Sequence, residues 1–89
     1  MPYIYSMEQN THYLRSIQDV NRVIMKRGFK MICKGHGMSF DHLTDPRAKS
    51  NRHNVIYYNR KNQMCLVKVG TYLIDNDIVS HGYCVTIHP

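Results

Sequence analysis

The basic side chains of this 89-residue chain are the residues best suited to bind a ligand. Twelve Lys and Arg face six Asp and Glu, giving a net charge of +6. All twelve lie between Arg15 and Lys68, where three carboxylates oppose them and leave a local balance of 12 − 3 = +9. The rest of the chain, after Lys68, has two Asp and no Lys or Arg. Such a one-sided field favours a polyanionic partner.

The segment 44–53 combines basic side chains with Ser, Asn and His and has no apolar periodicity, so we expect a long loop. Its donors are suited to phosphate oxygens. Tyr57 and Tyr58 follow, and an exposed tyrosine beside cations can stack on a base, although both tyrosines also fit an ordinary strand. The predicted nucleic-acid or partner-binding residues are Arg15, Arg22, Lys26, Lys30, Lys34, Arg47, Lys49, Arg52, Tyr57 and Tyr58.

Two short Cys/His pairs have the spacing of metal ligands. Cys33 and His36, and likewise His81 and Cys84, are separated by two residues, as in zinc sites built from two turns. Each pair has only one thiolate, however, and Cys33 and Cys84 fall at apolar positions of predicted strands, where a buried free cysteine is common. We therefore predict no metal or other cofactor, with zinc at these four residues as the alternative.

Three histidines lie close to the basic segment. His36, His42 and His53 could act as general acid or base beside a bound phosphate, which is the chemistry of a metal-independent ribonuclease. The chain has no Gly-rich phosphate loop, nucleophile elbow or calcium loop. We therefore predict that it is not an enzyme and keep the ribonuclease as an alternative.

The helix that would carry the first cations is predicted over 7–27. Ser6 and Gln9 fit a capping box at its start. Gly28 fits a left-handed residue after its end, with Phe29 folding back onto the helix in a Schellman motif. An apolar stripe at helical spacing supports this assignment: Tyr13, Leu14, Ile17, Val20 and Ile24.

After Gly28 the apolar residues alternate, which is typical of strands. We expect strands over 29–34 and 38–43 joined by a turn at 35–37, and a hairpin of 55–58 and 64–69 with a charged turn at 59–62. Short strands should follow at 71–74, 78–79 and 83–87, broken at 75–77 and at 81–82, with a helix over 71–80 as the competing assignment. The predicted fold is α+β: one small domain, 1–89, with an N-terminal amphipathic helix packed on a mainly antiparallel sheet of about four or five strands.

Several observations bear on the compartment and the partner. No apolar run reaches the roughly 20 residues that span a bilayer, the chain start has no signal-peptide pattern, and three cysteines suit a reduced, cytoplasmic protein. We predict a small basic module that docks on nucleic acid or a nucleoprotein complex, and an exposed strand over 83–87 could form a homodimer. Besides the ribonuclease, the alternative is an inhibitor or adaptor of phage or mobile-element type that binds an acidic host protein.

Overall fold

The computed structural model describes residues 10–32, 49–50 and 54–88 of the chain. Within these ranges it contains one helix and five strands, and the α+β class is confirmed. In chain order the elements are β1 (Thr11–Leu14), α1 (Ile17–Lys26), β2 (Lys49–Ser50), β3 (Asn54–Tyr58), β4 (Met64–Ile74) and β5 (Asp77–His88).

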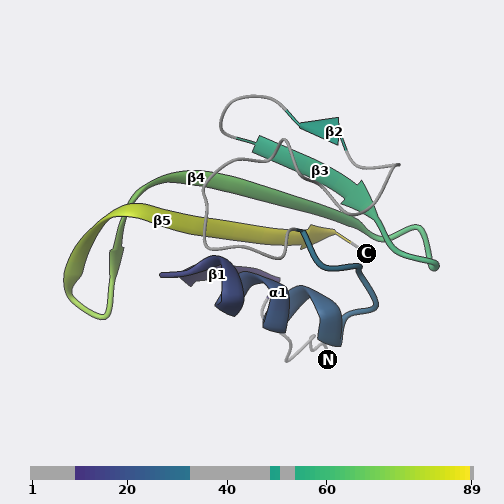
Figure 1. The fold of residues 1–89 in the computed structure, drawn as a ribbon, viewed down its shortest axis with the longest axis horizontal. Coiled ribbons are helices and arrows are strands. Elements are labelled where there is room, and N and C mark those ends of the chain that lie inside the picture. Colours follow the sequence, from purple (N-terminus) through teal and green to yellow (C-terminus); the bar gives the residue numbers. More distant parts are fainter. Residues whose placement is uncertain (1–9, 33–48, 51–53, 89) are drawn as a thin grey trace, which may run out of the picture.

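The strands form one sheet in the order β1-β5-β4-β3-β2, and every neighbouring pair is antiparallel. The long hairpin of β4 and β5 is its centre, and its turn extends beyond the shorter outer strands (Figure 1). Ile74 pairs with Asp77, so the loop has only Asp75 and Asn76. Both have positive φ, +51° and +68°, as tight type I′ hairpin turns require.

The core lies between α1 and one face of the sheet. Val55, Val67 and Val85 are aligned across β3, β4 and β5 and are completely buried. Figure 1 shows α1 running along this side of the sheet. The other buried members of the core cluster are Ile17, Val20, Ile24, Phe29, Ile32, Cys65, Tyr83 and Ile87.

The start of the helix differs from its prediction. The helix begins at Ile17, because Thr11–Leu14 form the edge strand β1 on β5 instead. Ser16 has extended backbone, and its Oγ accepts a hydrogen bond from the Asp19 N–H at 3.2 Å, which caps the helix. Tyr13 belongs to β1 and not to the helical stripe. The predicted cap at 6–9 lies outside the described residues.

The predicted end of the helix is confirmed. Gly28 has φ +87°, its N–H donates to Met25 O at 3.1 Å, and the Phe29 N–H donates to Ile24 O at 3.2 Å. These are the two hydrogen bonds of a Schellman motif. Phe29 and Ile24, the two residues of the apolar contact expected of this motif, both belong to the buried core cluster. In the described part of the chain, no helix has the length and apolar character that a membrane crossing requires.

The strand predictions have mixed outcomes. The hairpin of 55–58 and 64–69 is confirmed as β3 and β4, and the competing helix over 71–80 is wrong because β4 and β5 cover that range. Residues 29–32 form no strand, and 49–50, predicted as loop, form β2. The turn at 35–37, the strand at 38–43 and the remainder of the 44–53 loop lie outside the described residues.

The predicted break at 81–82 is absent, because β5 runs without interruption from Asp77 to His88. The register contains a bulge instead: Gly70 pairs with Gly82 and Tyr72 with Val79, so β5 has one residue more than β4 in between. Gly82 packs under Tyr72, where an added Cβ would lie 3.3 Å from the ring. This glycine therefore marks close packing inside a strand and not a turn.

Candidate functional site

A groove of about 510 Å³ lies between the end of α1 and the β3–β4 turn. We call it the basic groove, because four of its seven described lining residues are Lys or Arg and none is a carboxylate. Its walls come from two elements that are far apart in the sequence. The lining residues are Lys26, Arg27, Gly28, Asn59, Arg60, Lys61 and Gln63.

Asn59 shapes the β3–β4 wall of the basic groove. Its side chain is 3% exposed, and its Oδ1 accepts hydrogen bonds from the backbone N–H groups of Lys61 at 2.9 Å and Gln63 at 3.0 Å. The Asn62 N–H donates to Asn59 O at 3.0 Å, and Asn62 has φ +61°. A short polar side chain that bonds the backbone two residues ahead is a common way to hold a tight turn.

The same side chain joins the turn to the helix. Asn59 Nδ2 donates to Arg27 O at 2.8 Å and to Gln63 Oε1 at 2.8 Å. Arg27 is the C-cap of α1, where backbone carbonyls lack partners within the helix. Asn59 therefore satisfies a helix end and sets the distance between the two walls of the basic groove.

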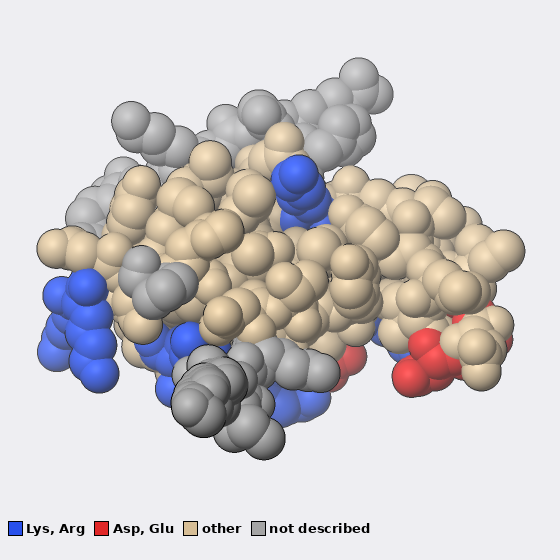
Figure 2. Space-filling view, turned by 180° about the vertical axis from the view of Figure 1, so that it is seen from behind, with Lys and Arg blue, Asp and Glu red and all other residues tan. Residues whose placement is uncertain are grey.

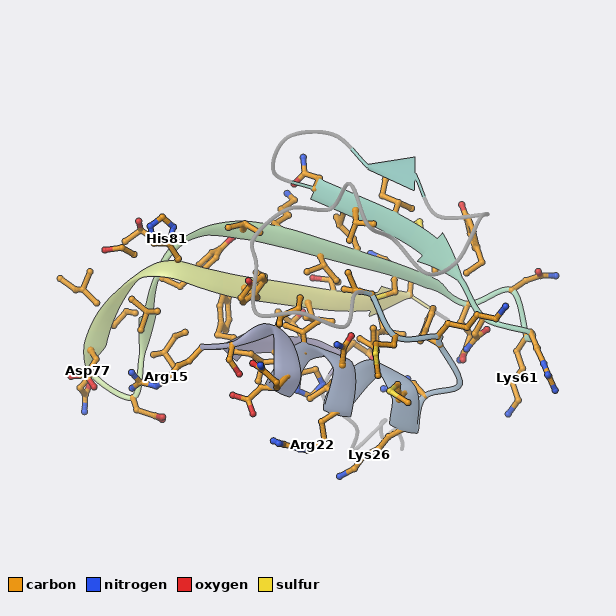
Figure 3. The ribbon with its side chains drawn as sticks, in the orientation of Figure 1. Arg15, Arg22, Lys26, Lys61, Asp77 and His81 are labelled. Atoms are coloured by element: carbon orange, nitrogen blue, oxygen red, sulfur yellow. The ribbon has the colours of Figure 1, made fainter. Side chains whose placement is uncertain are left out.

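Three cations of the groove are exposed and form no ion pair with any residue that the structure describes: Lys26, Arg60 and Lys61. Figure 3 shows Lys61 at the end of the molecule formed by the β3–β4 turn, and Lys26 on α1 below the middle, with its side chain directed away from that turn. Lys26 also offsets the partial negative charge at the end of the helix. This role at the helix end explains the position of Lys26 but not those of Arg60 and Lys61, which belong to a separate hairpin.

The opposite end of the molecule carries the β4–β5 turn with its carboxylates. Arg15 lies there: its Nη2 is 3.0 Å from Asp77 Oδ2 and 4.0 Å from Asp75 Oδ2, and it donates to Ile74 O at 3.1 Å. Figure 3 shows Arg15 directed toward Asp77. The structure thus separates Arg15 from Lys26, with which the helix prediction had grouped it.

Arg22 also has a carboxylate partner, because its Nη1 is 2.7 Å from Asp19 Oδ1 one turn earlier in α1. Figure 2 shows Lys and Arg at one end of the molecule and also below and near its middle, and Asp at the other end and near the middle. Among the described residues, the turn with Arg60 and Lys61 thus lies at one end, and the turn with Asp75 and Asp77 lies at the other.

The other predicted binding residues fall into three groups. Lys30 and Tyr58 lie beside the basic groove, in a second groove that shares Gly28, Asn59 and Arg60 with it. Lys49 is in β2 and Tyr57 in β3, and their side chains are not described. Lys34, Arg47 and Arg52 lie outside the described residues.

Four residues of the basic groove were not predicted from the sequence as site residues: Arg27, Asn59, Arg60 and Lys61. The charged turn between two β-prone runs was the available signal, because a hairpin turn must be exposed. That signal does not indicate which other element the turn faces.

His81 and Cys84 do not lie in a turn, where a zinc knuckle would place them. Both belong to strand β5, with His81 at the bulge. No group of three or more His, Cys, Asp or Glu that could hold a metal occurs among the residues the structure describes. Cys33 and His36, the other predicted pair, are outside them.

The two described cysteines should differ in reactivity. Burial raises the pKa of Cys65 from 9.0 to about 12, and this side chain is 0% exposed, whereas Cys84 is partly exposed. Because the thiolate is the reacting form, iodoacetamide at about pH 8 should alkylate Cys84 in the folded protein and leave Cys65 intact until the chain is unfolded. Peptide mass spectrometry separates the sites, and equal labelling of Cys65 and Cys84 in the folded state would contradict the burial.

The raised pKa also links Cys65 to alkaline stability. The folded state holds the Cys65 proton more tightly than the unfolded state. The contribution of the protonated thiol to the free energy of unfolding is therefore fully present below pH 9 and is lost as the pH rises toward 12. The same thiol is thus neutral in the physiological range and offers no nucleophile to the basic groove.

No family model matches the chain, and comparisons with curated proteins and with solved structures give no match either. The geometry and charge of the basic groove are therefore the basis for assigning a function.

Proposed function

We propose that this protein is a small binding module that holds the phosphate backbone of a nucleic acid in the basic groove, without catalysis. The observation that carries the proposal is that one groove is lined by Lys26 and Arg27, from the end of α1, and by Arg60 and Lys61, from the β3–β4 turn. Backbone phosphates are bound chiefly by Lys and Arg together with backbone and side-chain amides. The basic groove combines such groups on two walls held together by Asn59.

The separation of charge along the molecule supports the proposal. A polyanion attracts the end that carries Arg60 and Lys61, while the opposite turn, where Asp75 and Asp77 outnumber Arg15, is repelled and faces away. Such a field orients a small protein before contact and raises its association rate at low salt. Evenly scattered charges would serve solubility equally well but would not favour one orientation.

The described lining of the basic groove contains no histidine, cysteine or carboxylate. These are the usual general acids, bases and nucleophiles of phosphodiester cleavage. We therefore propose binding and not cleavage as the role of this groove.

The test is the salt dependence of binding by the whole chain. A fluorescein-labelled oligonucleotide of about 20 nucleotides is titrated with protein from about 25 mM to about 300 mM KCl, with fluorescence anisotropy as the readout. If roughly three to five cations each neutralise a phosphate of a single strand, log K should fall against log salt with a slope of about −2 to −3.5. An absence of binding at the lowest salt, or an affinity that does not change with salt, would refute the proposal.

A further inference from the structure

A second groove lies beside the basic groove. It has a volume of about 330 Å³, and we call it the Tyr58 groove. Its described lining is more apolar than that of the basic groove, although two cations remain at its edges. The lining residues are Met25, Gly28, Phe29, Lys30, Tyr58, Asn59 and Arg60.

Two of these residues offer apolar surface to a ligand. Tyr58 is 42% exposed and Met25 is 50% exposed, although both side chains are large and hydrophobic. Phe29, at 4% exposure, closes the floor. A half-exposed tyrosine ring with a polarisable thioether nearby suits a flat aromatic ligand.

The two grooves adjoin each other. Gly28, Asn59 and Arg60 line both of them, so one ligand can reach both, with a charged group in the basic groove and a flat apolar group beside Tyr58. A nucleotide combines these two parts, a phosphate and a planar base, on one short sugar. An acidic protein side chain provides the charge without the planar group.

We propose that the Tyr58 groove receives an unpaired base of the nucleic acid whose phosphates occupy the basic groove, so that the ligand is single-stranded. This inference rests on the proposed function. Bases of a duplex are stacked and paired in its interior, whereas the bases of a single strand expose their faces and stack on aromatic side chains. Such stacking tolerates any base. The Tyr58 groove fits this mode, because it offers an aromatic ring with Lys30 and Arg60 in the same lining.

The face of the sheet opposite to α1 provides a path for the rest of the strand. Tyr58 and Ile56 alternate along β3 and so share one face, and Ile56 is 38% exposed. Lys68 on the neighbouring β4 projects to the same face, since its partner Asn54 is two residues before Ile56. Figure 2 shows this side of the molecule as largely uncharged. A nucleic-acid strand leaving the Tyr58 groove can therefore cross this face past Ile56 and Lys68 without meeting a carboxylate of the described residues.

The first test uses the unaltered protein and three ligands of equal length: a single strand, its duplex, and a single strand of abasic nucleotides that keeps only the phosphates. At one low salt concentration we expect the single strand to bind about 5- to 50-fold more tightly than the abasic strand, because one or more stacked bases are lost. The single strand should also bind more tightly than the duplex, because the duplex offers no unstacked base to Tyr58.

The second test uses variants of Tyr58 with a matched control. Tyr58→Ala should weaken binding of the single strand about 5- to 50-fold and leave abasic binding within about twofold, while Tyr58→Phe keeps the ring and the affinity. The control is Tyr13→Ala: Tyr13 is 51% exposed on the same face but lies against Tyr72 at the far side of the sheet, with ring centroids 5.4 Å apart. Tyr13→Ala should change binding less than about twofold.

The outcomes distinguish this inference from the proposed function. Salt-dependent binding that is equal for single strand, duplex and abasic strand, or unchanged by Tyr58→Ala, would overturn the base site and leave phosphate binding in place. No binding of any of the three ligands would remove both. Because the abasic comparison needs no variant, it decides the question even if Tyr58→Ala fails to fold.

Discussion

Replacing Arg60 and Lys61 together by glutamine is expected to weaken oligonucleotide binding about 20- to 100-fold at low salt. Both side chains are exposed on the β3–β4 wall of the basic groove. Hydrogen bonds to charged groups contribute roughly 1.5–3 kcal/mol each before compensation by other contacts, and each 1.4 kcal/mol is a factor of about ten in affinity. The salt slope should also become shallower by about one to two, since fewer counterions are released.

The chain offers a control with the same change in charge. The double variant Arg15→Gln, Arg22→Gln also lowers the net charge from +6 to 6 − 2 = +4, but both residues are paired with carboxylates and Arg15 lies at the opposite end. Its affinity should fall less than about threefold, and its stability should change little, because exposed ion pairs contribute only about 0–1 kcal/mol. Equal losses in the two double variants would mean that total charge, and not the basic groove, determines binding.

Asn59→Ala is expected to lower the free energy of unfolding by about 3 kcal/mol, the largest stability effect we predict for a polar residue. The substitution removes four hydrogen bonds and leaves Arg27 O and the N–H groups of Lys61 and Gln63 without this partner. A buried polar group left unsatisfied costs roughly 1–3 kcal/mol. In a domain of this size, each kcal/mol lowers Tm by about 4–8 °C, so a decrease of roughly 10–20 °C should appear in thermal unfolding followed by circular dichroism.

Asn62→Gly is the matched control for Asn59→Ala. Asn62 is in the same turn and exposed, and its φ of +61° is a conformation that glycine adopts without strain. The control should change stability by less than about 1 kcal/mol. If Asn59→Ala proves as mild as the control, the hydrogen bonds between the turn and α1 do not hold the walls of the groove together.

The sequence predicted well those features that depend on neighbouring residues. The end of the helix at Gly28 was correct because the left-handed residue and the capping hydrogen bonds all involve residues within five positions. The β3–β4 hairpin was correct for the same reason, since alternation and a charged turn are local signals. Both features are essential to the site, because they form its two walls.

Features that depend on distant pairing were predicted incorrectly. The helical stripe was extended back through Tyr13 and Leu14, but Thr11–Leu14 pair with 83–86 of β5. The spacing of apolar residues within 11–14 cannot show that β5, far away in the sequence, has an edge with which these residues can pair. The glycine at 82 was taken for a turn because nothing in its vicinity reveals the Tyr72 ring that packs on it.

Some residues of the candidate site were named from the sequence. Lys26, Lys30 and Tyr58 each line one of the two adjoining grooves. The sequence prediction also grouped Arg15 and Arg22 with them, although the structure pairs these residues with Asp77 and Asp19. Asn59 was not singled out, because a turn asparagine is common and its bond to the end of α1 is not visible in its neighbours.

By itself the sequence determined the α+β class, where the helix ends, where the central hairpin turns, and the excess of positive charge in the middle of the chain. Only the tertiary structure decided which cations remain available to a ligand and which element faces the β3–β4 turn. The reason is physical: helix ends and turns depend on hydrogen bonds between near neighbours, whereas the partner of a charge depends on distance in space. Lys26 and Lys61 share a groove because Asn59 joins their elements, and Arg15 is paired because the β4–β5 turn returns to it.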